Sequence, residues 1–278
     1  MPIKIISEDI KNEIKNLYQS KPIKISEIAE KYQYSNPTII KILKGVKKWT
    51  KSKLNNPNMN ENYFDNIDNE HKAYYIGLMI ADGNVFQPKE GGRQMSTSIT
   101  LQNCDKYILE EFKKDLHLNH NINSDARGCS YIAVRSNKIG EGISKYGIVP
   151  KKTLKSFLPT NIDDKFMKDV VRGIFDGDGS ILVKTRKIRN RFIHIVSFCG
   201  THRLMSELSD YLYNKLNFQK HPNVYDYSDR NLSEIKIANQ HDFEIFMTWI
   251  YNDSTIYLKR KYDKYLLYLQ IKKERNSR

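Results

Sequence analysis

The sequence of 278 residues has little cysteine and no long apolar run. Its three cysteines, Cys104, Cys129 and Cys199, are odd in number and far apart, which argues against a disulfide framework and against a CxxC zinc site. No stretch approaches about 18 apolar residues, so we expect no membrane span, and the N-terminus lacks the apolar core of a signal peptide. These absences indicate a protein of a reducing compartment that is not secreted.

Positive charge is what the chain has in excess. There are 46 Lys and Arg residues against 32 Asp and Glu residues, which leaves a formal net charge of +14. Such a surplus points first to a polyanionic partner, although a basic surface that binds nothing is the alternative. Hydrophobic residues make up 39% of the chain and aromatic residues 11%, enough for a folded core and too many for a disordered chain.

The charge and the apolar residues divide the chain into segments. Residues 1–55 hold twelve lysines against five acidic residues, a net charge of +7. An Asn-rich stretch follows that has almost nothing to bury, which is typical of a linker. We therefore predict a small N-terminal domain over 1–53, a linker over 54–62, a large domain from residue 63, and a basic tail over 271–278.

The N-terminal domain is predicted to be helical. Its first helix is indicated by apolar residues at helical spacing, Ile10, Ile14 and Leu17. Ser26 is a candidate N-cap for the next helix, and Pro37 suits the first turn of another helix, which Gly45 would end. Two short helices joined by a tight turn, with the small Ala29 where they cross, resemble a helix-turn-helix.

In a helix-turn-helix domain the second helix enters the major groove of DNA with its N-terminal residues facing the bases. The sequence departs from the usual pattern at Gln33, where the turn commonly carries Gly. The residues predicted to contact DNA are Ser35, Asn36, Thr38 and Lys41. An ordinary helical hairpin is the alternative interpretation.

The large domain contains an internal duplication. One copy is YIGLMIADG over 75–83 and the other is VRGIFDGDG over 171–179, so that Asp82 and Asp178 are 96 residues apart. Each copy follows a helix-like pattern and precedes strand-like alternation. The duplication predicts two similar αβ halves, over 63–160 and 161–270.

Each copy has a physical interpretation. Small residues four apart let two helices approach closely, and the predicted helix-interface residues are Gly77, Ala81, Gly173 and Gly177. Each helix ends in Asp followed by Gly, which we expect to adopt the left-handed C-terminal conformation. Two carboxylates side by side at helix C-termini repel each other unless a cation lies between them. Carboxylates of this kind hold Mg²⁺ beside phosphate and so favour metal-assisted phosphodiester hydrolysis.

Other interpretations of these motifs are weaker. A lone Asp-Gly is more often a hairpin turn. The second copy, with Asp176, Asp178 and Ser180, also imitates the DxDGS loop of haloacid-dehalogenase-type phosphatases, but that reading leaves the first copy unexplained. An EF-hand loop fails because its Gly is misplaced and Lys187 stands at the twelfth position.

The chain resembles the LAGLIDADG homing endonucleases of the double-motif, single-chain type. The resemblance covers about residues 63–269 and rests on both motifs and their surroundings. These stretches are YFDNIDNEHKAYYIGLMIADG, YGIVPKKTLKSFLPTNIDDKFMKDVVRGIFDGDGSI and IYNDSTIYLKRKYDKYLLYL. It implies an α+β fold of two pseudo-symmetric αββαββα halves, whose antiparallel sheets lie along DNA, beside the small all-α N-terminal domain.

The resemblance also implies roles for particular residues. The last acid of each motif binds the catalytic metal in that family, which here gives Asp82 and Asp178, with Mg²⁺ or another divalent cation. VPKKT and YLKRK stand at equivalent places in the two halves and imply Lys151 and Lys259 as catalytic basic residues. The implied activity is site-specific cleavage of double-stranded DNA with short 3′ overhangs, by a monomer acting on a long, partly palindromic target.

Alternating residues after each motif predict strands that read DNA. Arg, Lys and Gln read base edges in the major groove, which a two-stranded ribbon can enter, while others of these side chains would hold phosphates. The residues predicted to contact DNA are Gln87, Lys89, Arg93, Arg135, Lys184, Arg186, Arg189, Arg191, Tyr225, Tyr227, Arg230 and Lys236. An ordinary solvated sheet face is the alternative for any one of them.

Three rival functions stay open. The first is a LAGLIDADG-derived maturase or transcription regulator that binds nucleic acid without cleaving it. The second is the phosphatase, which would hydrolyse a small phosphate ester and ignore DNA. The third, an intein-embedded nuclease, is disfavoured because no splice-junction Cys or Ser stands at the start of the chain. For the endonuclease we expect a cytoplasmic location, in a bacterial or phage-infected cell, or an organellar one.

Overall fold

The computed structural model describes residues 6–21, 23–46, 56–88, 94–151, 155–186, 191–227, 229 and 231–277, without the side chains of residues 186 and 191. Its contacts divide the chain into two compact units. The N-terminal unit comprises residues 1–59 with 117–120, and the main unit comprises 60–116 with 121–278. None of the described helices is long and apolar enough to cross a membrane.

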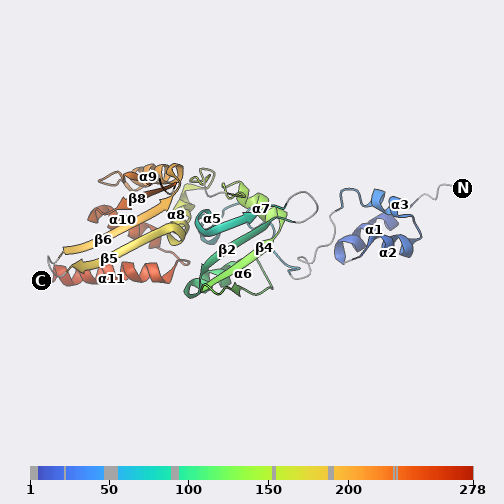
Figure 1. Cartoon of the computed structure of the whole chain (residues 1–278), viewed down its shortest axis with the longest axis horizontal. Helices are drawn as coiled ribbons and strands as arrows, with labels where there is room; N and C mark the ends of the chain where they lie inside the picture. The colour runs from blue at the N-terminus through green and yellow to red at the C-terminus, as the bar shows by residue number, and fades with distance from the viewer. Residues whose placement is uncertain are drawn as a thin grey trace. The chain divides into compact units, whose positions relative to one another are not determined.

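The structure describes three helices in the N-terminal unit (Figure 1), and they pack around one small core. They are α1 (Glu8–Ser20), α2 (Ile25–Tyr32) and α3 (Asn36–Ile42). Ile14 is fully buried between them, and Ile10 and Leu17 pack beside it on the same face of α1. The other buried residues of this core are Ile28, Ala29, Ile39 and Leu43.

The connection from α2 to α3 differs in part from the sequence expectation. The N-cap of α2 is Lys24 and not Ser26, and the Glu27 carboxylate accepts a 3.2 Å hydrogen bond from the backbone N–H of Lys24. Gln33 adopts the left-handed conformation, with φ 56° and ψ 42°. Gln33 therefore provides the positive φ that this turn needs, at a position where glycine is the common residue. Ser35 is the N-cap of α3, and Pro37 lies in its first turn.

The main unit repeats one order of elements. The first copy is α5 (Glu70–Asp82), β1 (Gly83–Phe86), β2 (Ser96–Gln102), α6 (Lys106–Asp115), β3 (Asn123–Ser124), β4 (Cys129–Arg135) and α7 (Asn137–Ser144). The second copy is α8 (Met167–Asp178), β5 (Gly179–Arg186), β6 (Arg191–Gly200), α9 (His202–Leu216), β7 (Val224–Tyr227), β8 (Leu232–Ile237) and α10 (Gln240–Tyr251). Helix α11 (Lys259–Asn276) follows, so residues 271–276 of the predicted basic tail continue this helix.

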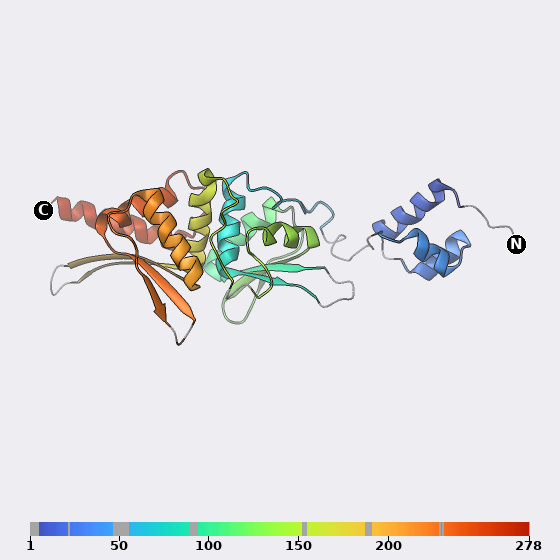
Figure 2. The ribbon, with the colours of Figure 1, turned by 90° about the horizontal axis from the view of Figure 1, so that it is seen from above.

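Both copies build the same kind of sheet. Each sheet is antiparallel and four-stranded, with the orders β1-β2-β4-β3 and β5-β6-β8-β7. Figure 2 shows the strands on one side of the main unit and its helices on the other. The prediction of an α+β fold with two αββαββα halves is confirmed at this level.

Burial alternates along the strands, so each sheet has a core face and an exposed face. In β2 the side chains of Thr97, Ile99 and Leu101 are buried, while those between them are not. In β8 the buried positions are Ser233, Ile235 and Ile237. The core faces are covered by helices, which is the pattern expected of antiparallel sheets with one solvated face.

The Asn-rich segment does more than join the two units. Asn56 is buried, and its side-chain oxygen accepts a 2.7 Å hydrogen bond from the backbone N–H of Asn119. Its amide group also contacts Nδ1 of His120 at 3.1 Å. The linker predicted over 54–62 therefore includes one residue that is fixed by specific bonds, because a buried amide needs partners.

Candidate functional site

The two motif helices lie side by side and run parallel. Contacts advance together along both helices, with Gly173 against Tyr74 near the middle and Gly177 against Ala81 near the ends. A Cβ atom added at Gly77 would lie 1.9 Å from the carbonyl oxygen of Val170. The backbones thus touch where a side chain would normally separate them, and the parallel direction places both C-termini at the same end.

A buried ion-pair network connects the two motif helices near the N-terminus of α5, away from the two aspartates. Arg172 of α8 is fully buried, and its Nη2 donates to Oε1 of Glu70, the first residue of α5, at 2.6 Å. The same guanidinium donates to the carbonyl oxygens of Ile250 and Ile256 at 2.8 and 2.9 Å. Because Arg172 has several acceptors, its charge is compensated without water, and the helix pair is fixed at both ends.

Asp82 and Asp178 are the last residues of α5 and α8, and both are exposed. The Cβ position of Gly177 is 3.1 Å from Oδ2 of Asp82, so this carboxylate lies against the last turn of the neighbouring helix. The structure therefore brings the two motif acids to one place, where both sheets begin.

The glycines after these acids are not left-handed, contrary to the sequence expectation. Gly83 has φ −76° and ψ 145°, and Gly179 has φ −89° and ψ 163°. Each helix passes directly into a strand, which folds back over the last helical turn. A Cβ at Gly83 would lie 2.5 Å from the carbonyl oxygen of Met79, and one at Gly179 would lie 2.4 Å from that of Phe175. Lack of space, and not positive φ, requires glycine here.

Lys261 of α11 caps the end of α8, a role that the sequence analysis missed. Its buried ammonium donates to the carbonyl oxygens of Phe175, Asp176 and Gly179 at 2.5, 2.8 and 2.5 Å. Burial lowers the pKa of Lys261 to about 8, while the negative charges of Asp176, Asp82 and Asp178 oppose that shift. The positive charge lies at the negative end of the helix dipole.

Asp176, inside the second motif, is the buried counterpart of this lysine. Its Oδ2 accepts hydrogen bonds from Tyr74 Oη of the first half at 2.9 Å and from the backbone N–H of Leu258 at 2.8 Å. Burial raises the pKa of Asp176 to about 6, and the charge of Lys261 is the main opposing influence. Asp176 is thus a structural acid that joins the halves, unlike the exposed Asp178.

The two predicted basic residues lie in different surroundings. Lys259 is exposed at the start of α11, with its Nζ 4.8 Å from the ring centre of Tyr107 in the first half. Lys151 is exposed in a turn with φ 58°. Lys261 and Tyr268, seven residues apart, are the buried residues of α11, but helical spacing alone does not mark a lysine as buried.

Those predicted DNA-contacting residues of the main unit whose side chains the structure describes lie on or beside the exposed sheet faces. Those that the structure describes as exposed are Gln87, Arg135, Lys184, Tyr225, Tyr227 and Lys236. Lys89, Arg93, Arg189 and Arg230 lie outside the described residues, and for Arg186 and Arg191 only the backbone is described. Glu234 accepts from Tyr227 Oη at 2.8 Å and pairs with Lys236 at 2.7 Å, so part of the positive charge on this face is neutralised.

In the N-terminal unit Ser35, Asn36 and Thr38 lie at the start of α3, and Lys41 lies in its last turn. Ser35, Asn36 and Lys41 are exposed, and Thr38 is half-buried. The hydroxyl groups of Ser35 and Thr38 are 2.9 Å apart. These polar groups stand at the N-terminus of a helix, where backbone N–H groups favour anions.

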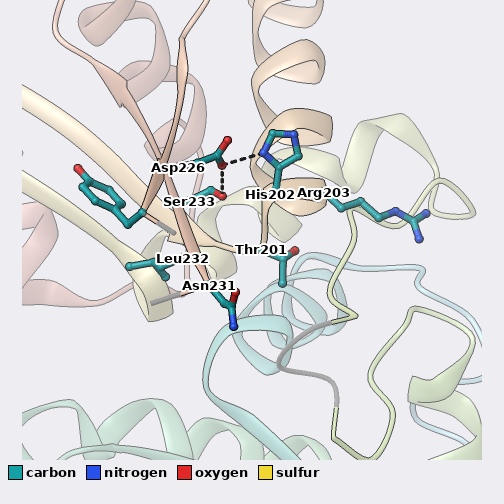
Figure 3. A pocket seen from close by; sticks show the side chains of 8 residues that line it. Thr201, His202, Arg203, Asp226, Asn231, Leu232 and Ser233 are labelled. Carbon is teal, nitrogen blue, oxygen red and sulfur yellow. Dashed lines mark hydrogen bonds and ion pairs between the residues drawn. The ribbon is translucent and has the colours of Figure 1, made fainter. Parts of the chain in front are cut away.

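A pocket of about 480 Å³ lies in the second half, at the N-terminus of α9 and the β7–β8 hairpin (Figure 3). Ser233 Oγ donates to Oδ1 of Asp226 at 2.6 Å, and His202 Nδ1 lies 2.8 Å from the same oxygen. A catalytic triad needs the serine to bond the histidine, whereas here both bind the acid. Neither motif aspartate lines this pocket, and we assign it no catalytic role.

Comparisons with known proteins support the fold. No protein-family model matches the chain, and no curated protein sequence matches it significantly. Among solved structures, I-SmaMI, a LAGLIDADG homing endonuclease bound to cleaved DNA, is similar with a TM-score of 0.51 and 14% identity over 72% of this chain and 87% of that one. I-LtrWI, of the same class and bound to target DNA, gives a TM-score of 0.52 and 14% identity over 77% and 92%. I-SmaMI on an uncleaved target with calcium ions gives 0.51 and 15% over 75% and 93%. The main unit therefore has the LAGLIDADG homing endonuclease fold.

Proposed function

We propose that this protein is a site-specific endonuclease of double-stranded DNA that hydrolyses phosphodiester bonds with a divalent metal, Mg²⁺ in the first place. The observation that carries the proposal is the pair Asp82 and Asp178, held at adjacent ends of two parallel helices in backbone contact. Solved structures with this fold include homing endonucleases bound to DNA, which supports DNA as the substrate.

The residues present fit a magnesium ion. Among the described residues no group of three or more His, Cys, Asp or Glu side chains could hold a metal, so the site would offer the two motif carboxylates. Mg²⁺ commonly binds one or two carboxylates and completes its shell with water and substrate phosphate oxygens. When bound, the ion supplies charge stabilisation to the phosphate under attack. One structure with this fold was solved with calcium ions.

The protein's own groups would prepare this site. Lys261 brings a positive charge beside the two acids and to the C-terminus of α8, which reduces the repulsion between the carboxylates. The hydrogen bond from Tyr74 of α5 to Asp176 of α8 fixes the two helices against each other. Lys151 and Lys259 stay candidates for contacts with the cleaved phosphates, and both are exposed as such contacts require.

The sheets and the N-terminal unit would recognise the target. A monomer with two similar but non-identical halves would read a long, only partly palindromic sequence through its exposed sheet faces. The N-terminal unit, as a helix-turn-helix, would add contacts through Ser35, Asn36, Thr38 and Lys41 and increase affinity through effective concentration.

The nuclease proposal is tested by selection and cleavage. The full chain is used to enrich duplexes from a randomised library, and the enriched sequence is incubated with protein and Mg²⁺. We expect a double-strand cut that a chelator prevents. The double variant Asp82→Asn/Asp178→Asn should bind the duplex within a few-fold of the wild type and leave it intact. Cutting by the double variant at the wild-type rate would overturn the assignment of the acids.

The role of the N-terminal unit has its own test. A chain without residues 1–53 should protect a shorter stretch of the selected duplex from nuclease digestion and bind it more weakly, while the cut position stays the same. A footprint of unchanged length would contradict a DNA-binding role for this unit.

A further inference from the structure

The exposed face of the second sheet carries a strip of aliphatic side chains. Leu182 of β5 pairs with Ile195 of β6, and Ile193 follows two residues away on the same face. Leu182 is 40% exposed, and the two isoleucines are half-buried. Cross-strand neighbours and their diagonals lie within contact reach, so these three residues, here called the aliphatic strip, form one apolar surface.

The strip lies close to the motif acid and among polar groups. Leu182 follows Asp178 by four residues along a strand that starts at the helix end. Ser180 and Ser197 pair on the same face between the acid and the strip. Lys184 pairs with Ile193 on the far side, and Lys236 lies on the same face of the sheet. An apolar surface framed by hydroxyl and ammonium groups fits a ligand with apolar spots between anionic groups.

The first sheet has no matching strip among its described strand residues. The position equivalent to Leu182 is Phe86, four residues after Asp82 and 59% exposed. Its partner across the strands is Ser96, and the next pair on that face is Asn84 with Ser98. The same sequence separation thus places an apolar side chain after each motif acid. Only in the second half do neighbouring apolar residues extend it into a strip.

We propose that the aliphatic strip recognises thymine by contact with its 5-methyl group in the major groove, in the half-site that the second sheet covers. This inference rests on the proposed function. Thymine is the base that presents an apolar group on its major-groove edge, and a serine or lysine gains nothing from that group. Lys184 would hold a flanking phosphate, since its charge complements the DNA backbone, whereas the charge of Lys236 is paired with Glu234.

Replacement of thymine by deoxyuridine tests the proposal, since it removes the methyl group and leaves every hydrogen-bonding atom in place. With divalent ions chelated, binding of the full chain to the selected duplex is measured for each single replacement. Burial of one methyl group corresponds to about four-fold in affinity. We expect a loss of that size at one or more thymines of one half-site.

Variants connect the effect to the strip. The variant Leu182→Ala should bind the thymine and deoxyuridine duplexes equally at the sensitive positions. The same result is expected for a second variant, Leu182→Ser, which introduces a side chain common on the first sheet. Leu266→Ala is the matched control, since Leu266 is 44% exposed on α11, and it should keep the wild-type sensitivity. Thermal unfolding checks that each variant is folded.

The possible outcomes are distinct. An unchanged deoxyuridine effect in both Leu182 variants, the absence of any effect in the wild type, or a selected half-site without thymine would overturn the inference while the nuclease proposal stands. A chain that enriches no duplex would overturn the proposed function together with the inference.

Discussion

The two sheets of the main unit have the same strand order, and each begins at a motif helix, yet their exposed faces differ. The first face carries hydroxyl and amide groups along its central strand β2, at Ser96, Ser98, Thr100 and Gln102. The second carries the aliphatic strip with Lys184 and Lys236. Core positions set the shared fold, whereas exposed positions of a strand can change without repacking. A chain of this kind would therefore read two different half-sites.

Buried charge is a further feature to weigh in this comparison. Arg172 and Lys261, both fully or almost fully buried, belong to the second half. Arg172 donates to Glu70 of the first half, whereas Lys261 donates only to carbonyl groups of the second half among its described bonds. Buried cations hold geometry at a cost in desolvation. We expect the two halves to contribute equally to DNA cleavage, whereas stability depends on buried cations of the second half. Four experiments test this comparison.

The largest effect is expected for Lys261→Met. Removal of one partner from a buried pair typically costs about 3–5 kcal/mol in the free energy of unfolding, because the other charge stays buried. The pKa of Asp176 is raised to about 6 and that of Lys261 is lowered to about 8, so both are charged between these values. The loss should be greatest there and shrink below pH 6, where Asp176 takes up a proton.

Denaturant unfolding of wild type and variant at several pH values measures this loss. Lys273→Met, at an exposed position of the same helix, is the control and should stay within about 0.5 kcal/mol of the wild type. A loss that is the same at pH 5 and pH 7 would contradict the coupling to Asp176.

The next effect compares Asp82→Asn with Asp178→Asn. Each single variant should lose the double-strand product by at least about 100-fold in single-turnover rate, since even the partners of metal ligands contribute 10–100-fold. Asp226→Asn, which changes an acid of the pocket in the second half, should cut at the wild-type rate. If one motif variant still cuts both strands at that rate, the two halves are not equivalent.

A smaller effect is expected for the glycines of the helix pair. Gly77→Ala and Gly173→Ala would place a Cβ 1.9 Å and 2.1 Å from carbonyl oxygens of the other helix, and overpacking of this kind costs about 1–3 kcal/mol. In Gly140→Ala the new atom meets the flexible side chain of Met95, so this control should change little. Unfolding midpoints measure all three variants. If Gly173→Ala kept the wild-type stability while Gly77→Ala lost it, the two helices would contribute unequally to their contact.

The smallest effect concerns surface charge. Lys184→Ala on the second face and Arg135→Ala on the first should each weaken binding a few-fold and reduce the slope of log affinity against log salt by about 1. Binding at a series of salt concentrations gives both slopes, with Lys273→Ala as the neutral control. Unequal slopes would mean that the faces differ in phosphate contacts as well as in base contacts.

Much of this architecture could be predicted from the sequence, for reasons that are local. The motif acids were found because the duplication repeats Asp after small residues at helical spacing, and the strands because burial alternates with period two. Gly83 and Gly179 were identified but given the wrong conformation, since the sequence does not show that each helix passes directly into a strand.

What sequence reasoning missed depends on contacts between distant segments. Lys261 was passed over in favour of Lys259, because a lysine is rarely buried and its acceptors are carbonyl groups more than 80 residues away. Arg172 gave no signal for the same reason, as two of its acceptors are carbonyls of Ile250 and Ile256. Backbone acceptors are carried by every residue type, so no sequence pattern marks them.

The direct passage from helix to strand has a mechanical consequence for the proposed nuclease. Asp82 ends α5 and Gly83 begins β1, and Asp178 and Gly179 stand in the same relation. No flexible loop therefore separates the strand that would contact the bases from the carboxylate that would bind the metal. A duplex whose bases displace β1 or β5 must also displace the carboxylate. Errors in sequence would then be rejected by slow cutting after binding, and fidelity would be a property of the rate and not of the affinity alone.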